Sequence, residues 1–231
     1  MIRARLVDAL RRLRRPGAQG WLGPALVAAA WGWMIVGAVR ARRFACCGSW
    51  PAWPEEAAGW QAMVAAMMVP TTLGSQRDVA RRSYRARRLQ TVAAYITGYM
   101  LAWAALGLGV VAMRQLAITH EPFVAPALCV GHALWVLLPA RERWFAACHR
   151  QIPLYPIGAR ADLDAARQGL AHGVPCVAMC WPLMLACTVT GHAVGMMVGG
   201  TALVLIEKSM FRLVRPPLVI GSLALAVVSL F

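Results

Sequence analysis

Residues 168–206 read QGLAHGVPCVAMCWPLMLACTVTGHAVGMMVGGTALVLI, a run of 39 residues without a formally charged side chain. The hydrocarbon core of a bilayer is about 30 Å thick and roughly 20 helical residues cross it, so this run is long enough for nearly two crossings. We therefore expect a hairpin of two membrane helices that turns near Thr190 to His192.

The composition places the rest of the chain in the same class. Hydrophobic residues make up 60% of the 231 residues and charged residues only 14%, which is far more apolar than an ordinary soluble domain. We predict an all-α fold, a polytopic transmembrane helical bundle of about seven helices, or six if the short last segment does not cross. Besides the hairpin, the predicted spans are 21–39, 58–73, 91–113, 123–139 and 216–231.

The net charge of +15 is better explained by membrane topology than by a nucleic-acid partner, which we do not expect. Twenty of the 24 Lys and Arg residues lie in segments 1–15, 77–88, 141–167 and 208–215, and the loops between these segments hold the other four. Basic loops stay in the cytoplasm. The distribution therefore predicts a cytoplasmic N-terminus, although the three arginines within 40–43 oppose the rule locally.

We expect a basic cytoplasmic segment at residues 1–20 and a single transmembrane helical domain at 21–231, because no linker, repeat or low-complexity tract divides the chain. The first apolar stretch is long and leads into further spans, so we expect an uncleaved anchor rather than a signal peptide. The sizeable loop is 140–168. We expect the next helix to begin near its end, capped by Asp162 or Asp164.

The motifs of nucleotide binding and of common hydrolases, which are the P-loop, GxGxxG, HExxH and GxSxG, do not occur in the sequence. The predicted spans also contain no Asp, Glu, Lys or Arg, whereas a proton-driven carrier usually keeps a carboxylate at mid-membrane. Thiols, thioethers and imidazoles are the polar groups of these spans. Active pumping would therefore need a gradient or a partner.

Sulfur ligands recur at helical spacing in the predicted spans. Cys176 and Cys180 are four residues apart, as are Met63 and Met67, so each pair shares a helix face. The helical rise places both pairs in the inner half of the membrane. The candidate metal ligands are Cys176, Cys180, Met63, Met67, Met68 and His132, with Cys129, Met196 and Met197 at comparable depth.

The ligand chemistry favours Cu(I), with zinc as the weaker alternative. One thiolate neutralises Cu⁺, so uncharged Met or His can complete the coordination, whereas a divalent ion needs two thiolates and unpaired charge is costly at this depth. A packing role is the alternative for each methionine and for His132 taken alone.

Two motifs carry a resemblance to a known family. Residues 60–70 match WxxMxxAMMxP, residues 169–184 match GxxxGxxCxxxCWxLM, and Glu207 and Lys208 close the following span. Together they resemble a bacterial family of predicted metal-binding integral membrane proteins that share a domain of unknown function, over about 57–210. The resemblance implies a multi-pass inner-membrane protein that binds metal, without an established reaction. Its expected partners are the lipid bilayer and a metal chaperone or another membrane subunit.

The sequence departs from the family pattern at two places. The family's cytoplasmic loop carries two cysteines four residues apart, but Trp144 stands in the first position and Cys148 in the second. The resemblance makes Cys148 a candidate ligand, with His149 as a substitute for the missing thiol. Ala193 and Val194 stand where the family has a Met-Asn pair after the hairpin turn.

Three functions fit the sequence. The first is the binding, delivery or export of a soft metal, for which the ligand chemistry favours Cu(I). The second is a membrane thiol oxidoreductase that uses Cys176 and Cys180, or Cys46 and Cys47, although cysteines four apart on a helix are poorly aimed for a disulfide. The third is a non-catalytic assembly or anchoring subunit that packs a partner against the glycine seam within 191–199. An enzyme is the less favoured class.

Overall fold

The computed structural model describes residues 20–43, 53–115, 123–155, 158–209 and 215–230. Every regular element in these ranges is a helix, which confirms the predicted all-α class. The predicted N-terminal segment 1–20 and the Cys46–Cys47 pair lie essentially outside the described residues. The elements are α2 (Leu22–Arg43), α3 (Trp53–Met68), η2 (Val69–Thr72), α4 (Leu73–Arg82), η3 (Arg85–Arg87), α5 (Arg88–Gln115), α6 (Val124–Leu137), α7 (Ala140–Cys148), α8 (Ala159–Val189), α9 (Val194–Ser209) and α10 (Arg215–Val228).

A helix lies at each predicted membrane span, but only some of these helices are long enough to cross a membrane. Within the described residues, Leu22–Val39, Arg85–Met113 and Arg160–Val189 are long and apolar enough to cross a membrane. A fourth span forms if α6 and α7, which meet at an angle of 86°, are counted as one. Helices α3 and α9 have 16 residues each and α10 has 14, fewer than the roughly 20 that a crossing takes.

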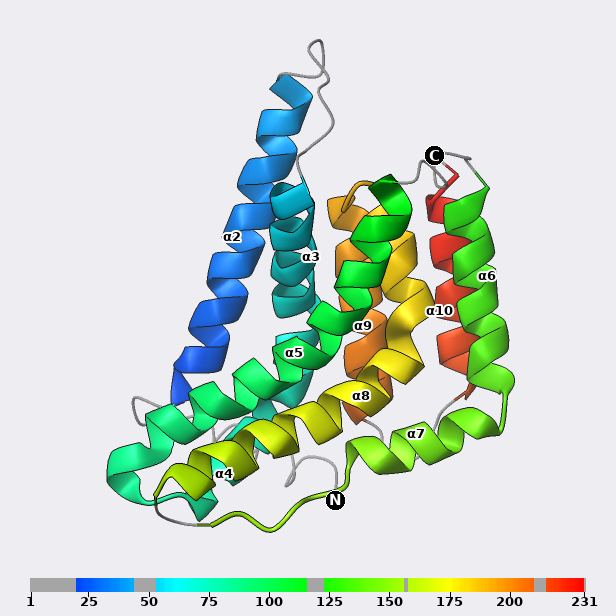
Figure 1. Cartoon of the computed structure of the whole chain (residues 1–231). Coiled ribbons are helices and arrows are strands. Elements are labelled where there is room, and N and C mark those ends of the chain that lie inside the picture. The colour runs from blue at the N-terminus through cyan, green and yellow to red at the C-terminus, as the bar shows by residue number, and fades with distance from the viewer. Residues whose placement is uncertain (1–19, 44–52, 116–122, 156–157, 210–214, 231) are drawn as a thin grey trace, which may run out of the picture.

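Helix α8 is the central element of the fold. It is 31 residues long and contacts α5, α6, α7 and α9. Figure 1 shows that α5 and α8 bend, so that their first halves lie near α4 and α7 at the lower end of the molecule. The helices that run upward from this end are α2, α3, α6, α9 and α10. Pro175 and Pro182 lie inside α8, and proline interrupts the hydrogen-bond ladder and bends a helix. The candidate ligands Cys176 and Cys180 lie between these two prolines.

Glycines bring the backbones of α5 and α8 into direct contact. A Cβ atom added at Gly98 of α5 would overlap the carbonyl group of Ala166, and one added at Gly169 of α8 would overlap the carbonyl group of Tyr95. A Cβ atom added at Gly173 would lie 2.6 Å from the Ala102 methyl carbon of α5. Small residues at such spacing allow close helix packing in membrane proteins. The GxxxG part of the second sequence motif therefore fixes α8 against α5.

The structure corrects the prediction for 140–168, which is not a plain loop because it contains α7. Helix α8 begins at Ala159 after Gly158, which has a φ of 86° and makes no side-chain cap. Neither Asp162 nor Asp164 is the cap, since both lie inside the helix and bind other groups. The predicted hairpin turn is confirmed between α8 and α9.

A buried ion pair connects α7 to α9. The Arg141 guanidinium lies 2.8 Å from the Glu207 carboxylate, and their side chains are 0% and 2% exposed. Burial raises the pKa of the Glu207 carboxyl and Arg141 opposes that rise. A buried charge that loses its partner is strongly destabilising, so this pair holds α7 on the bundle.

Gly98→Ala is expected to lower the thermal unfolding temperature in detergent, because the added methyl would overlap the Ala166 carbonyl. Overpacking of this kind typically costs about 1–3 kcal/mol. Gly109→Ala is the matched control, since it adds the same methyl to the same helix where nothing lies within 4 Å. Equal losses in the two variants, followed by circular dichroism, would contradict this account of the α5–α8 contact.

Glu207→Ala is expected to destabilise the protein by about 3–5 kcal/mol, because it leaves the Arg141 guanidinium buried without a counter-ion. The double variant Arg141→Met, Glu207→Leu removes both charges and should cost much less than the single change. Chemical unfolding in mixed micelles measures both effects. A double variant that is no more stable than Glu207→Ala would show that the ion pair does not explain the loss.

Candidate metal centre

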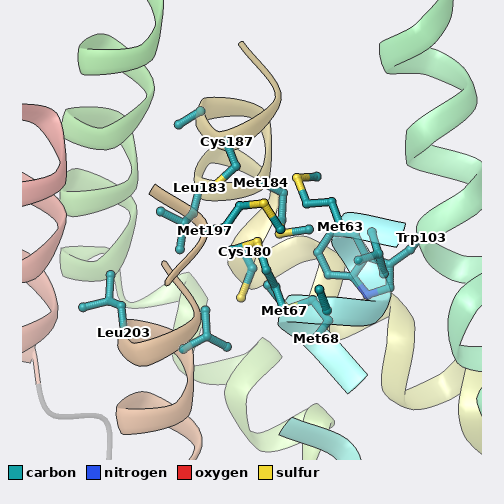
Figure 2. Close-up of a cluster of buried hydrophobic side chains, with 14 of the residues drawn as sticks. Met63, Met67, Met68, Trp103, Cys180, Leu183, Met184, Cys187, Met197 and Leu203 are labelled. Carbon is teal, nitrogen blue, oxygen red and sulfur yellow. The ribbon is translucent and has the colours of Figure 1, made fainter. Parts of the chain in front are cut away.

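Sulfur side chains from three helices gather in the core of the bundle. Figure 2 shows them as one cluster between α3, α8 and α9. Their relative exposure is essentially zero, so water is excluded from this part of the structure. The members labelled in the figure are Met63, Met67 and Met68 of α3, Cys180, Met184 and Cys187 of α8, and Met197 of α9.

Helical periodicity and one glycine assemble this cluster. Met63 and Met67 share a face of α3, and Cys176, Cys180 and Met184 follow each other at four-residue spacing on α8. Gly200 allows α9 to approach, because a Cβ there would lie 2.9 Å from the Met67 methyl carbon. The structure thus brings the methionines of α3 and α9 together with the thiols of α8, while Cys129 and His132 of the fourth predicted span lie on α6.

Cys176 is the most polar position beside the sulfur cluster. Its Sγ lies 3.1 Å from the Lys208 Nζ and 2.9 Å from the Tyr99 hydroxyl, and Cys180 forms a further hydrogen bond to it. An ammonium group and hydrogen-bond donors stabilise a thiolate, which is the form of cysteine that binds metals. The surroundings of Cys176 therefore suit a metal-binding thiolate.

Lys208 reaches this thiol from the end of α9. Its Nζ also donates a hydrogen bond to the Thr71 hydroxyl at 3.2 Å. Burial lowers the pKa of the Lys208 ammonium, but the neighbouring thiolate of Cys176 outweighs burial and raises the pKa above its usual range. Lys208 is therefore a cation that lies against the candidate ligand.

Cys148 lies beside α8, where its described hydrogen-bond partner is Met179. Its thiol is 3.7 Å from the Met179 sulfur, and burial raises the pKa of Cys148 to about 12. The neighbouring His149 is exposed, and its Nδ1 lies 2.9 Å from the Phe145 carbonyl oxygen. The structure therefore places Cys148 near the sulfur-rich face of α8 and gives His149 a local partner on its own helix.

The two histidines of the predicted spans have packing partners. His132 of α6 places its Nδ1 2.8 Å from the Ser222 hydroxyl of α10, and its Nε2 has no hydrogen-bond partner among the described residues. His172 of α8 places its Nδ1 2.6 Å from the Tyr95 hydroxyl of α5. The contact to Ser222 places His132 at the α6–α10 interface, outside the labelled cluster of α3, α8 and α9.

The donor set fits Cu(I) better than zinc. Across the described residues, no three His, Cys, Asp or Glu side chains come together in a way that could hold a metal. Structural zinc sites take four ligands of these types. Cu(I) accepts thiolate and thioether sulfur, and the Cys176–Cys180 pair with the adjoining methionines supplies both.

Cavities flank the sulfur cluster at its two ends. One, of about 260 Å³, is lined by Cys148, His172 and Lys208 among other residues, and Lys208 separates it from Cys176. The other, of about 250 Å³, is lined by residues that include Glu55 and Thr188, and the Thr188 hydroxyl lies 3.9 Å from the Met63 sulfur. The cluster is therefore close to a hollow on either side.

Sequence reasoning missed the polar partners of Cys176. Tyr99 lies 77 positions and Lys208 lies 32 positions from the thiol along the chain. Tyr95 and Tyr99 are four residues apart, as are His172 and Cys176, so each pair shares a helix face. This matched spacing was the available signal that the two tyrosines could contact His172 and Cys176. Met184, which we had not counted as a ligand, also belongs to the cluster.

Comparison with known protein families gives a match over most of the chain. The sequence model of a family described as PpoB2, copper chaperone, matches residues 57–230, which include most of α3, the helices from α4 to α10 and the whole sulfur cluster. No curated protein and no solved structure matches. The match confirms that the chain belongs to a metal-related family, as the motifs indicated. The likeness to the family with a domain of unknown function stays a resemblance. The chain belongs to the PpoB2 copper chaperone family.

Proposed function

We propose that this protein is a polytopic inner-membrane copper chaperone that binds Cu(I) at Cys176 and Cys180 and passes it to a metal-handling partner. The observation that carries the proposal is the Lys208 ammonium 3.1 Å from the Cys176 sulfur, at the edge of a buried sulfur cluster. The methionines Met63 and Met67 complete the coordination or relay the ion. Copper is the cargo of this protein rather than a resident cofactor.

The surface of the bundle supports the membrane assignment. Trp33, Leu108, Leu134 and Ile220 are between 59% and 67% exposed, and they lie on α2, α5, α6 and α10. Large apolar side chains exposed on several faces are unfavourable in water and favourable in lipid. Helices α4 and α7, which carry five arginines, lie at one end, and we place that end and the N-terminus in the cytoplasm.

Charge balance supports Cu(I) over a divalent ion. Two thiolates around Cu⁺ carry one negative charge, and the ammonium of Lys208 cancels it. The same thiolates around Zn²⁺ are already neutral, so Lys208 would leave one buried positive charge unpaired. Unpaired charge is costly away from water, and the centre is therefore better matched to the monovalent ion.

Replacing both thiols should abolish copper binding. Purified protein is loaded anaerobically with Cu(I), washed and assayed for metal by elemental analysis. We expect near-stoichiometric copper in the wild type and loss of it in Cys176→Ala, Cys180→Ala, because thiolates provide the anionic ligands.

Cys129→Ala is the matched control, since Cys129 is equally buried but lies on α6. Cys46→Ser with Cys47→Ser tests the other cysteine pair, and both controls should retain copper. Full copper content in the Cys176, Cys180 double variant would end the proposal. A wild-type protein that retains no metal would favour the assembly-subunit function.

Met63→Leu combined with Met67→Leu is expected to weaken Cu(I) binding by on the order of tenfold, because leucine preserves the volume but removes the thioethers. Competition with a chromophoric Cu(I) chelator measures the affinity, and X-ray absorption counts sulfur neighbours of the metal. Met34→Leu, at a buried methionine of α2, is the control. Unchanged affinity and sulfur count in the double variant would assign these methionines to packing.

A further inference from the structure

The cavity of about 260 Å³ opens at the same end of the molecule as α4 and α7. Its described lining comes from η2, α4, the segment after α7, α8 and α9, so several parts of the chain meet there. Lys208 and Cys148 belong to this lining, and Lys208 is in turn in contact with Cys176. The cavity therefore leads from the surface to the edge of the candidate metal centre.

The charge of this cavity is positive. Among its described lining residues the cations are Arg82, Arg150 and Lys208, and the carboxylate is Asp78. Asp78 is shared with other groups, since its oxygens lie 3.7 Å from the Arg81 guanidinium and 3.5 Å from the Gln151 amide nitrogen. A concave site with excess positive charge concentrates anions.

We propose that this cavity receives Cu(I) as a low-molecular-weight anionic thiolate complex, from which Cys176 takes the ion. The inference rests on the proposed function and adds the form in which copper arrives. Cu(I) is bound by soft thiolates, and two thiolates around Cu⁺ form an anion that a cationic hollow attracts. A bare cuprous ion would instead be repelled by the three cations.

The exchange is balanced without electron transfer. A bond from copper to Sγ of Cys176 forms as one copper–sulfur bond of the donor breaks, and a second exchange with Cys180 releases the other donor thiol. The metal remains Cu(I) throughout. Each donor thiolate leaves with its electron pair. It takes up the proton that the incoming cysteine has lost, or a proton from water, and it leaves through the cationic cavity.

The depth of the cysteines favours a small donor over a protein. Cys176 is 0% exposed and Cys148 is 6% exposed, so the donor sulfur has to enter the cavity to reach either thiol. A hollow of about 260 Å³ lies just below the roughly 300–1,000 Å³ of typical small-molecule sites, so it admits one arm of a small donor and would not admit a folded domain. The arginines Arg82 and Arg150 are exposed and face incoming ligands first.

The test compares two Cu(I) donors of opposite charge, the anionic glutathione complex and the cationic acetonitrile complex. In Arg82→Gln, Arg150→Gln the initial rate of copper transfer from the glutathione complex should fall roughly tenfold and lose much of its salt dependence. The rate from the acetonitrile complex should not fall, and the final copper content should equal that of the wild type. The control Arg143→Gln, Arg160→Gln removes two exposed arginines that do not line the cavity, and it should behave as the wild type.

Calorimetry with copper-free glutathione gives a second readout, since its binding should weaken in the Arg82, Arg150 variant and not in the control. Unchanged transfer rates and unchanged glutathione binding in a variant that still loads copper would overturn this inference and leave the proposed function intact. Equal slowing with both donors would also overturn it. Failure of the wild type to retain copper from either donor would end the proposed function and this inference together.

Discussion

The close contact of α5 with α8 is the constraint on which the candidate centre depends. Gly98 and Gly169 let the two backbones touch, and this fixes the register between the helices. With that register set, Tyr95 meets His172 and, one turn further along both helices, Tyr99 meets Cys176. The same packing that stabilises the bundle therefore also supplies a hydrogen-bond partner to the thiol, so the fold and the site cannot vary independently.

Burial of charge explains how the end of α9 is held in place. Lys208 and Glu207 are adjacent on α9, yet Lys208 pairs with Cys176 of α8 while Glu207 pairs with Arg141 of α7. A buried charge needs a partner of opposite sign, because the surrounding protein does not replace the solvation by water. The end of α9 is thus tied to two neighbours, and Lys208 also lines the cavity beside it.

The sequence predicted those features that depend on local periodicity. Four-residue spacing placed Met63 with Met67 and Cys176 with Cys180 on common faces, and the uncharged run placed a turn near residue 191. It did not predict α7, because a short polar helix between longer apolar ones carries a weak hydropathy signal. It also missed the contact of Lys208 with Cys176, since the reach of a long side chain between two helices depends on their packing and not on either helix alone.

The position of the thiols relative to the two cavities determines where a copper chaperone of this fold would exchange its metal. Ligand exchange needs an incoming ligand to reach the metal before the outgoing ligand has left, so the site needs a path from solvent to one metal ligand. Cys176, Met184 and Met197 are all buried, but the Lys208 side chain that contacts Cys176 also lines the cavity, so the path leads to Cys176 first. A neutral thioether binds Cu⁺ without adding charge, and an anionic thiolate binds it with charge compensation, so the cysteine end of the cluster should hold the ion more tightly than the methionine end. Copper would then be captured at the end that faces the cationic cavity, and the methionines would offer weaker positions from which a partner can take it.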